Sequence, residues 1–179
     1  MKNMSLFSQL LQVIPRNIFN RLVRGFKTEY RSKGFKSWDQ FVAMLFCQFA
    51  DAQSLREISY RLQSCEGKLS HLGVSAPAHS TLANANKIRS WKLYEALFYG
   101  LLDHIQGSLD LRSKRKLSIT NKLYSLDSTT IDLCLSLYDW AKFRARKGAI
   151  KLHMRLDHDG YLPDFVLVTD GKTHDSTAA

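Results

Sequence analysis

The sequence predicts an α+β protein in which a helical, basic N-terminal domain precedes a short antiparallel β-meander. Apolar residues recur at α-helical spacing to about residue 106 and afterwards alternate with polar residues at the spacing of a β-strand. Between the two patterns lies a charged run, Arg112-Ser113-Lys114-Arg115-Lys116, which is typical of a linker. The predicted divisions are a helical domain over residues 1–110, a basic linker over 111–120 and a β-rich part over 121–179.

Each predicted helix has its own start or stop signal. A first apolar stripe is interrupted at Pro15, which suits the first turn of a second helix. Capping boxes predict further helix starts at Ser37 and Ser54. A loop rich in Gly, Ser and Pro then leads to an expected N-cap at Ser80, and the helix that begins near residue 91 is expected to end at Gly107.

The β-rich part contains three predicted strands with short connections. Residues 122–126 and 165–169 have strand composition. Residues 150–157 alternate strictly, with Ile150, Leu152, Met154 and Leu156 on the expected buried face and Lys151, His153, Arg155 and Asp157 on the expected wet face. The run Asp157-His158-Asp159-Gly160 supplies a hairpin turn, so the strands should form an antiparallel meander.

The positive charge is concentrated in the N-terminal two thirds of the chain. The whole chain has a formal charge of +10, and residues 1–120 account for all of it with 18 Lys/Arg against 8 Asp/Glu. Residues 121–179 hold 8 of each. A basic part joined to a neutral part favours a polyanionic partner, most simply nucleic acid, although a basic solvated surface is the alternative.

Several classes of protein are excluded by composition and motif. The three cysteines form no CxxC pair, which argues against a disulfide framework or structural zinc. The sequence has no apolar run long enough for a membrane span and no signal-peptide cleavage site, so a cytoplasmic protein is expected. No P-loop or nucleophile-elbow motif is present.

The segment 54–90 has the plan of a helix–turn–helix, with a longer loop than usual, and a plain helical bundle remains the alternative. The expected DNA-facing residues are polar or basic and lie on two predicted helices: Arg16, Arg21, Arg24 and Lys27 on one, and Ser80, Thr81, Asn84, Lys87 and Arg89 on the other.

Asp127 is the candidate catalytic and metal-binding residue. It follows a strand-like run and could bind Mg²⁺ through its carboxylate, although Asp-Ser-Thr-Thr is also good turn chemistry. Lys151 and His153 could support such a site or be ordinary residues of a wet strand face. A basic segment within twenty residues of Asp127 could contact phosphates or be a solvated loop; its residues are Lys142, Arg144, Arg146 and Lys147.

Four blocks of the sequence together resemble a known family. The blocks are SWDQFVAMLFCQFADAQSLREIS, HLGVSAPAHSTLANANKIR, LDSTTIDLCLSLYDWAKFRARKGAIKLH and LVTDGKTHD. In order and spacing they resemble the bacterial insertion-sequence transposases of the IS-four family, in the subgroup with a small helical N-terminal domain. The resemblance covers about residues 7–175.

The resemblance implies a ribonuclease H-like catalytic domain with an Asp, Asp, Glu catalytic set and two Mg²⁺ ions. The first Asp falls on Asp127, and the family's Lys-x-His element falls on Lys151 and His153. Its Gly-x-x-His-Asp element falls on Gly171, His174 and Asp175. The Asp-Arg-Gly-Tyr block that carries the second Asp, and the later Glu, have no counterpart here.

The resemblance therefore implies DNA transposition, and the sequence is expected to represent a truncated transposase that is inactive by itself. The full-length relatives cut the ends of an insertion sequence and transfer the strands. The alternatives are a non-catalytic DNA-binding fragment that inhibits an intact transposase, and a pseudogene product. The implied partners are insertion-sequence ends and a second chain, as a homodimer or a heterodimer with full-length transposase, in a nucleoid-associated location.

Overall fold

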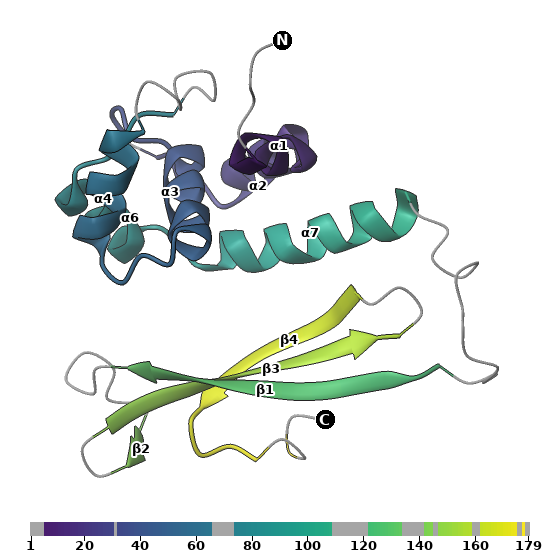
Figure 1. The fold of residues 1–179 in the computed structure, drawn as a ribbon. Helices are drawn as coiled ribbons and strands as arrows, with labels where there is room; N and C mark the ends of the chain where they lie inside the picture. Colours follow the sequence, from purple (N-terminus) through teal and green to yellow (C-terminus); the bar gives the residue numbers. More distant parts are fainter. Residues whose placement is uncertain are drawn as a thin grey trace. The chain divides into compact units, whose positions relative to one another are not determined.

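The computed structural model describes residues 6–30, 32–65, 74–108, 122–133, 142–144, 147–158, 162–174 and 177. It divides the chain into two compact units, residues 1–101 and 102–179. In the described residues, helices precede an antiparallel sheet, so the predicted α+β layout is confirmed (Figure 1). The predicted linker, residues 111–120, lies outside this description.

The helices of the first unit begin close to the predicted signals. They are α1 (Leu6–Val13), α2 (Arg16–Gly25), α3 (Ser37–Phe49), α4 (Leu55–Ser64), α6 (His79–Ile88) and the beginning of α7 (Lys92–Ser108). Pro15 is the N-cap of α2, with a φ of −66°. At α4 the Ser54 hydroxyl accepts a hydrogen bond from the Glu57 N–H at 3.2 Å, as the sequence pattern predicts.

Two predicted caps were wrong by one or two residues. Ser37 is the first helical residue of α3 and not its cap, and its N–H donates to Glu29 Oε1 at 2.8 Å. The cap is Lys36, whose N–H donates to Asp39 Oδ2 at 2.9 Å. The N-cap of α6 is Ala78, without a capping side chain, because the helix begins one residue before Ser80.

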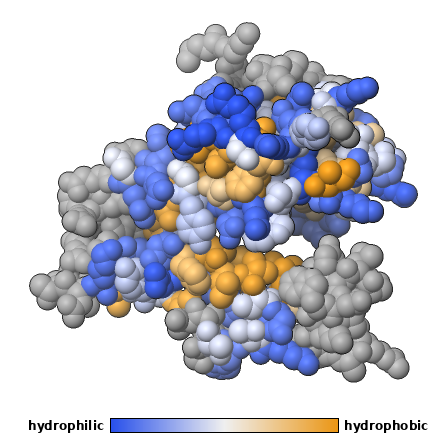
Figure 2. Space-filling view, turned by 180° about the vertical axis from the view of Figure 1, so that it is seen from behind, coloured by the Kyte–Doolittle hydropathy of each residue, from blue (hydrophilic) through white to orange (hydrophobic). Residues whose placement is uncertain are grey.

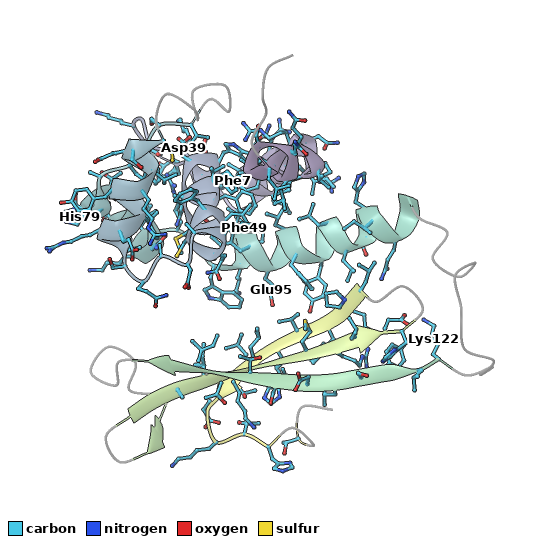
Figure 3. All side chains as sticks on the ribbon, in the orientation of Figure 1. Phe7, Asp39, Phe49, His79, Glu95 and Lys122 are labelled. Carbon is cyan, nitrogen blue, oxygen red and sulfur yellow. The ribbon has the colours of Figure 1, made fainter. Side chains whose placement is uncertain are left out.

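α3 is the central helix of the first unit, with α1 and α2 on one side and α4 and α6 on the other (Figure 1). Its adjacent residues Val42 and Ala43 are both fully buried, but they belong to different hydrophobic clusters. Val42 packs with residues of α1, α2 and α7, and Ala43 packs with residues of α4 and α6. Phe7 of α1 contacts both clusters and lies with its ring centroid 6.1 Å from that of Phe49 (Figure 3).

The sheet of the second unit is built around one central strand. Its strands are β1 (Tyr124–Leu133), β2 (Lys142–Arg144), β3 (Lys147–Asp157) and β4 (Leu162–Asp170). β3 pairs antiparallel with β1 along one edge and with β4 and the short β2 along the other. The order β1-β3-β4 is the predicted meander, and β2 is a strand that sequence analysis missed.

The alternation of β3 was predicted correctly, but the exposure of its two faces was not. Met154, expected to be buried, is 39% exposed, whereas His153, expected to be wet, is fully buried. Figure 2 shows hydrophobic side chains gathered on one side of the sheet, and the exposed ones on that face include Ile131, Met154 and Val168. His153 is buried on the opposite face, where the turn after β4 is fastened.

Candidate nucleic-acid interface

Helix α6 packs on the rest of its unit through a narrow stripe. Only Leu82 and Ala85 are buried, at 0% and 7% exposure, and Leu82 joins the cluster of Ile58 and Leu62 from α4. All the other side chains of the helix are exposed: His79, Ser80, Thr81, Ala83, Asn84, Asn86, Lys87 and Ile88. A helix held on one edge in this way presents most of its circumference to a partner.

A groove runs between α6 and the loop that joins α2 to α3. We call it the α6 groove; it has a volume of about 250 Å³ and is lined chiefly by Tyr30, Lys33 and Phe35 of the loop and by Thr81, Asn84 and Ile88 of the helix. Tyr30 and Ile88 are 73% and 71% exposed. Thr81 and Asn84, two of the predicted DNA contacts, are thus brought together with an aromatic ring and a cation that sequence analysis missed.

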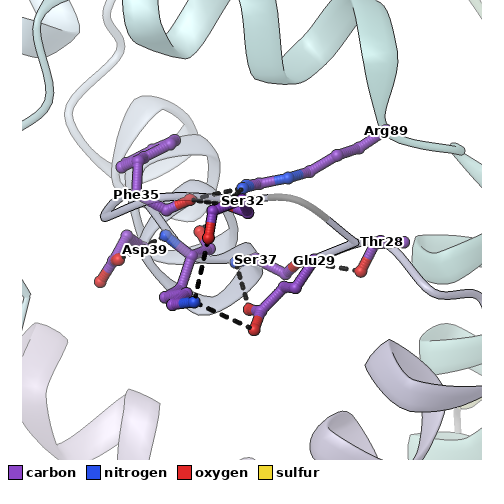
Figure 4. A network of polar contacts seen from close by, with 8 residues as sticks. Thr28, Glu29, Ser32, Phe35, Ser37, Asp39 and Arg89 are labelled. Atoms are coloured by element: carbon purple, nitrogen blue, oxygen red, sulfur yellow. Dashed lines mark hydrogen bonds and ion pairs between the residues drawn. The ribbon is translucent and has the colours of Figure 1, made fainter.

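Arg89 does not belong to this exposed set. Its guanidinium donates to Ser32 Oγ at 3.2 Å and to Phe35 O (Figure 4). It also donates to Lys36 O and Gln40 Oε1, both at 3.0 Å. The group therefore connects the C-terminal end of α6 to the loop in front of α3. Four of its five guanidinium N–H donors are therefore used inside the fold, so the geometry does not support the prediction of Arg89 as a DNA contact.

The predicted cations of α2 lie on the other side of α3 from α6 (Figure 1). Arg21, Arg24 and Lys27 are exposed. Arg16 instead stacks on the core, with its Cζ atom 3.6 Å from the centroid of the Trp38 ring. Burial lowers the pKa of Arg16, and the charge of Asp39 partly offsets this. The predicted DNA-binding residues therefore form two separate groups and not one patch.

Asp127 lies on β1 with an exposed side chain, and its Oδ1 accepts a hydrogen bond from the Ser128 N–H at 2.8 Å. Its partner across the sheet is Met154, whereas Lys151 and His153 lie opposite Thr130 and Ser128. Because successive strand residues point to opposite faces, Asp127 is on the other face from Lys151 and His153. The structure does not bring these three predicted site residues together.

Lys151 fastens the turn that follows β4, and His153 contacts the end of β4 itself. His153 Nε2 lies 2.8 Å from Thr169 Oγ1, and Lys151 Nζ donates to Thr173 O at 3.1 Å. The same turn is closed by Asp170, which accepts from the N–H and hydroxyl of Thr173. These hydrogen bonds with Thr173 lower the pKa of the Asp170 carboxyl. The Lys-x-His pair therefore holds the end of β4 and the turn after it against β3.

The described residues do not fit a two-metal site. None of them form a group of three His, Cys, Asp or Glu side chains that could hold a metal ion. Asp127 offers one carboxylate, and clamping two cations requires several. The side chains of the predicted basic segment, Lys142, Arg144 and Lys147, lie outside the description, as do Arg146 and Asp175 entirely.

A second hollow, at the junction of α3, α6 and α7, was also missed by sequence analysis. It has a volume of about 390 Å³, and its lining includes Trp91 and Tyr94. Trp91 is 65% exposed. The available signal was an aromatic residue in a polar helix connection, Arg89-Ser90-Trp91, where no apolar stripe requires one.

Comparison with known proteins identifies one part of the chain. Residues 2–75 match the model of a domain of unknown function, DUF4372. No curated protein and no solved structure matches the chain. In the described helices, none is long and apolar enough to cross a membrane. The matched span includes α1 to α4 and ends before α6, so the N-terminal part of the chain is similar to a domain commonly found in transposase-like proteins.

Proposed function

We propose that the first unit binds duplex DNA against the exposed face of α6 and that the chain derives from a DNA transposition system. The observation that carries the proposal is the packing of α6, which is held by Leu82 and Ala85 while its polar residues remain exposed. Recognition helices of helix–turn–helix proteins are presented in this manner, with their outward residues available to the major groove.

The side chains around the α6 groove have the chemistry that DNA requires. Asn84 offers an amide, which can pair with the edge of an adenine, and Thr81 offers a hydroxyl. Lys33 and Lys87 offer exposed ammonium groups for phosphates. In this assignment the side chains of α6 contact base edges in the major groove of the DNA, and the lysines position the DNA backbone.

Charge supports the same partner. Residues 1–101 contain 14 Lys/Arg against 6 Asp/Glu, a formal charge of +8. A domain with this excess attracts a polyanion over a long range, and its affinity falls steeply as salt rises. The match to a domain commonly found in transposase-like proteins supports transposition as the process that this binding serves.

DNA cleavage is not part of the proposed activity of the described residues. Asp127 remains the residue that the family resemblance assigns to Mg²⁺, but the described residues contain no group of three His, Cys, Asp or Glu side chains that could hold a metal ion. We therefore propose a binding role at the ends of an insertion sequence, and a chain of this kind could occupy those ends in place of an active transposase. A partner chain, identical or full-length, belongs to the same proposal.

The test is fluorescence anisotropy with a short mixed-sequence DNA duplex over a salt series. The double variant Asn84→Ala/Lys87→Ala should bind at least about tenfold more weakly, and its salt slope should fall by about 1 because one phosphate contact is lost. The matched control is Gln63→Ala/Arg56→Ala on α4, which removes an exposed amide and an exposed cation. Equal losses in the two double variants, or no binding at low salt, would overturn the proposal.

A further inference from the structure

The hollow at the junction of α3, α6 and α7 has the size of a small-molecule site. Its volume is about 390 Å³, within the range of about 300–1,000 Å³ that is usual for ligand pockets. All its lining residues belong to the first unit. Two groups of side chains matter for what it can hold: the aromatic residues Phe41, Trp91 and Tyr94, and the amides Gln40, Gln48 and Asn86.

The aromatic residues offer a stacking surface. Phe41 and Tyr94 are stacked on each other, with ring centroids 6.3 Å apart and an angle of 21° between the rings. Trp91 lies immediately before α7 and has 65% of its surface exposed. An indole exposed at the edge of a hollow is a platform for a flat ring, and one base stacked on an aromatic side chain contributes about 1–3 kcal/mol of binding.

The polar groups suit a flat ligand with donors and acceptors at its edge. The Tyr94 hydroxyl is buried and has no hydrogen-bond partner among the described residues. Burial raises the pKa of Tyr94 to about 12, so the hydroxyl is a neutral donor at physiological pH. Asn86 accepts a hydrogen bond from Gln40 at 2.7 Å, and its NH₂ group lies 3.5 Å from Met44 Sδ, a weak acceptor. Tyr94 therefore keeps an unused hydroxyl, and Asn86 keeps an amide NH₂ group whose described partner is only a weak acceptor.

We propose that this hollow takes one unpaired nucleobase of the DNA that α6 binds. The inference rests on the proposed function, and it adds the kind of DNA that is preferred. Three features together favour a nucleobase as the ligand: an aromatic surface for stacking, polar groups that can bond the edge of a flat ring, and exposed cations at the α6–α7 junction. Lys87 and Lys92 are both exposed there, on either side of the connection, where the phosphates of an extruded nucleotide would need them.

The hollow also shares a helix with the proposed duplex site. Asn86 lines the hollow, whereas Asn84 and Thr81 line the α6 groove. Arg89 lines both the groove and the hollow, so the two sites adjoin at the C-terminal end of α6. A nucleotide leaving the stack of a duplex held in the groove would therefore have the hollow beside it. Unpairing a base costs a few kcal/mol, so DNA in which the base is already unpaired should bind more tightly than a paired duplex.

The experiment compares two DNA duplexes of the same sequence, one fully paired and one with a single bulged 2-aminopurine. The wild-type chain should bind the bulged duplex about tenfold more tightly, and the 2-aminopurine emission should fall on binding because the base stacks on Trp91. Trp91→Ala should remove both the preference and the quenching, and Trp91→Phe should restore most of the quenching.

A second variant tests the polar edge. Tyr94→Phe keeps the ring and removes the unpartnered hydroxyl, so it should fold normally and lose about fivefold of the preference. The control is Tyr99→Phe, also on α7 but not in the lining of the hollow, which should keep the full preference. Equal binding of the two duplexes by the wild-type chain would overturn the nucleobase proposal and leave duplex binding intact. Binding of neither duplex would overturn both proposals.

Discussion

Arg89 shows how a single side chain can be misjudged from its place in a sequence. It follows a polar helix in a basic part of the chain, which favoured a phosphate contact. Its guanidinium instead satisfies two backbone carbonyls and two side chains of the 32–40 segment. Five donors in a fixed planar fork make this possible, and no short-range pattern predicts acceptors that lie more than forty positions away.

Replacement of Arg89 by lysine should therefore cost stability even though the charge is kept. An ammonium group cannot reach all four acceptors, so we expect a loss of about 2–3 kcal/mol and a melting temperature lower by about 10 °C. The measurement is thermal unfolding followed by circular dichroism. Lys87→Ala, an exposed change on the same helix, should stay within about 0.5 kcal/mol of the wild type. Equal melting temperatures for Arg89→Lys and the wild type would refute this role.

At the scale of elements, α6 combines a small buried stripe with a large exposed surface. Leu82 is its one large side chain that is fully buried, and it packs against α4 residues Ile58 and Leu62. Stability and partner binding are thus assigned to different residues of one helix. The spacing of apolar residues predicted this helix, but not its first residue. The helix begins at His79, before the predicted cap Ser80, and its N-cap Ala78 has no side chain that could have signalled the start.

Two substitutions should separate the two roles of α6. Leu82→Ala leaves a cavity in the cluster shared with α4 and should destabilise the chain by about 2–5 kcal/mol. Ile88→Ala removes a side chain of similar size that is 71% exposed, so the free energy of unfolding should change by less than about 0.5 kcal/mol. Urea denaturation gives both values. Similar destabilisation in the two variants would show that α6 is packed differently from this account.

In the sheet, the sequence predicted which residues share a face of β3 but not which face is buried. Alternation along β3 was visible in the sequence, but the exposure of each face depends on what covers it. His153 is buried where the turn of Asp170 and Thr173 is tied to β3, and that contact joins residues some twenty positions apart. The register also put Asp127 on the face of Met154. Asp127 and the Lys-x-His element, which the family resemblance places in one site, therefore lie on different faces of the sheet.

At the scale of the whole molecule, layout was more predictable than chemistry. The order of helices and strands follows from local periodicity and turn residues, which act over a few positions. The α6 groove, the hollow and the turn held by Lys151 each need residues from distant segments, so composition and spacing could not reveal them. The concentration of positive charge was visible in the sequence, but the separation of the exposed α2 cations from Lys87 on α6 required the fold.

A metal-dependent reaction requires ligands assembled from across a molecule, and this leads to a prediction about Mg²⁺. Because the described residues contain no group of three His, Cys, Asp or Glu side chains that could hold a metal ion, we expect Mg²⁺ neither to raise the melting temperature nor to cause nicking of bound DNA. Differential scanning fluorimetry and a supercoiled-plasmid nicking assay test this, with Asp127→Ala as the matched variant. Mg²⁺-dependent nicking that disappears in Asp127→Ala would contradict the prediction and restore a catalytic role.

The network of Arg89 has a further consequence for the α6 groove. One wall of the groove is the helix that Arg89 follows, and the other wall includes Ser32 and Phe35, to which Arg89 donates. The two walls of the groove are therefore hydrogen-bonded to each other at one end, and these bonds hold the width of the groove. Binding in such a groove costs little free energy for ordering the loop, so the affinity depends mainly on how well the partner fits the groove. A partner wider than the α6 groove would have to break the hydrogen bonds of Arg89 first.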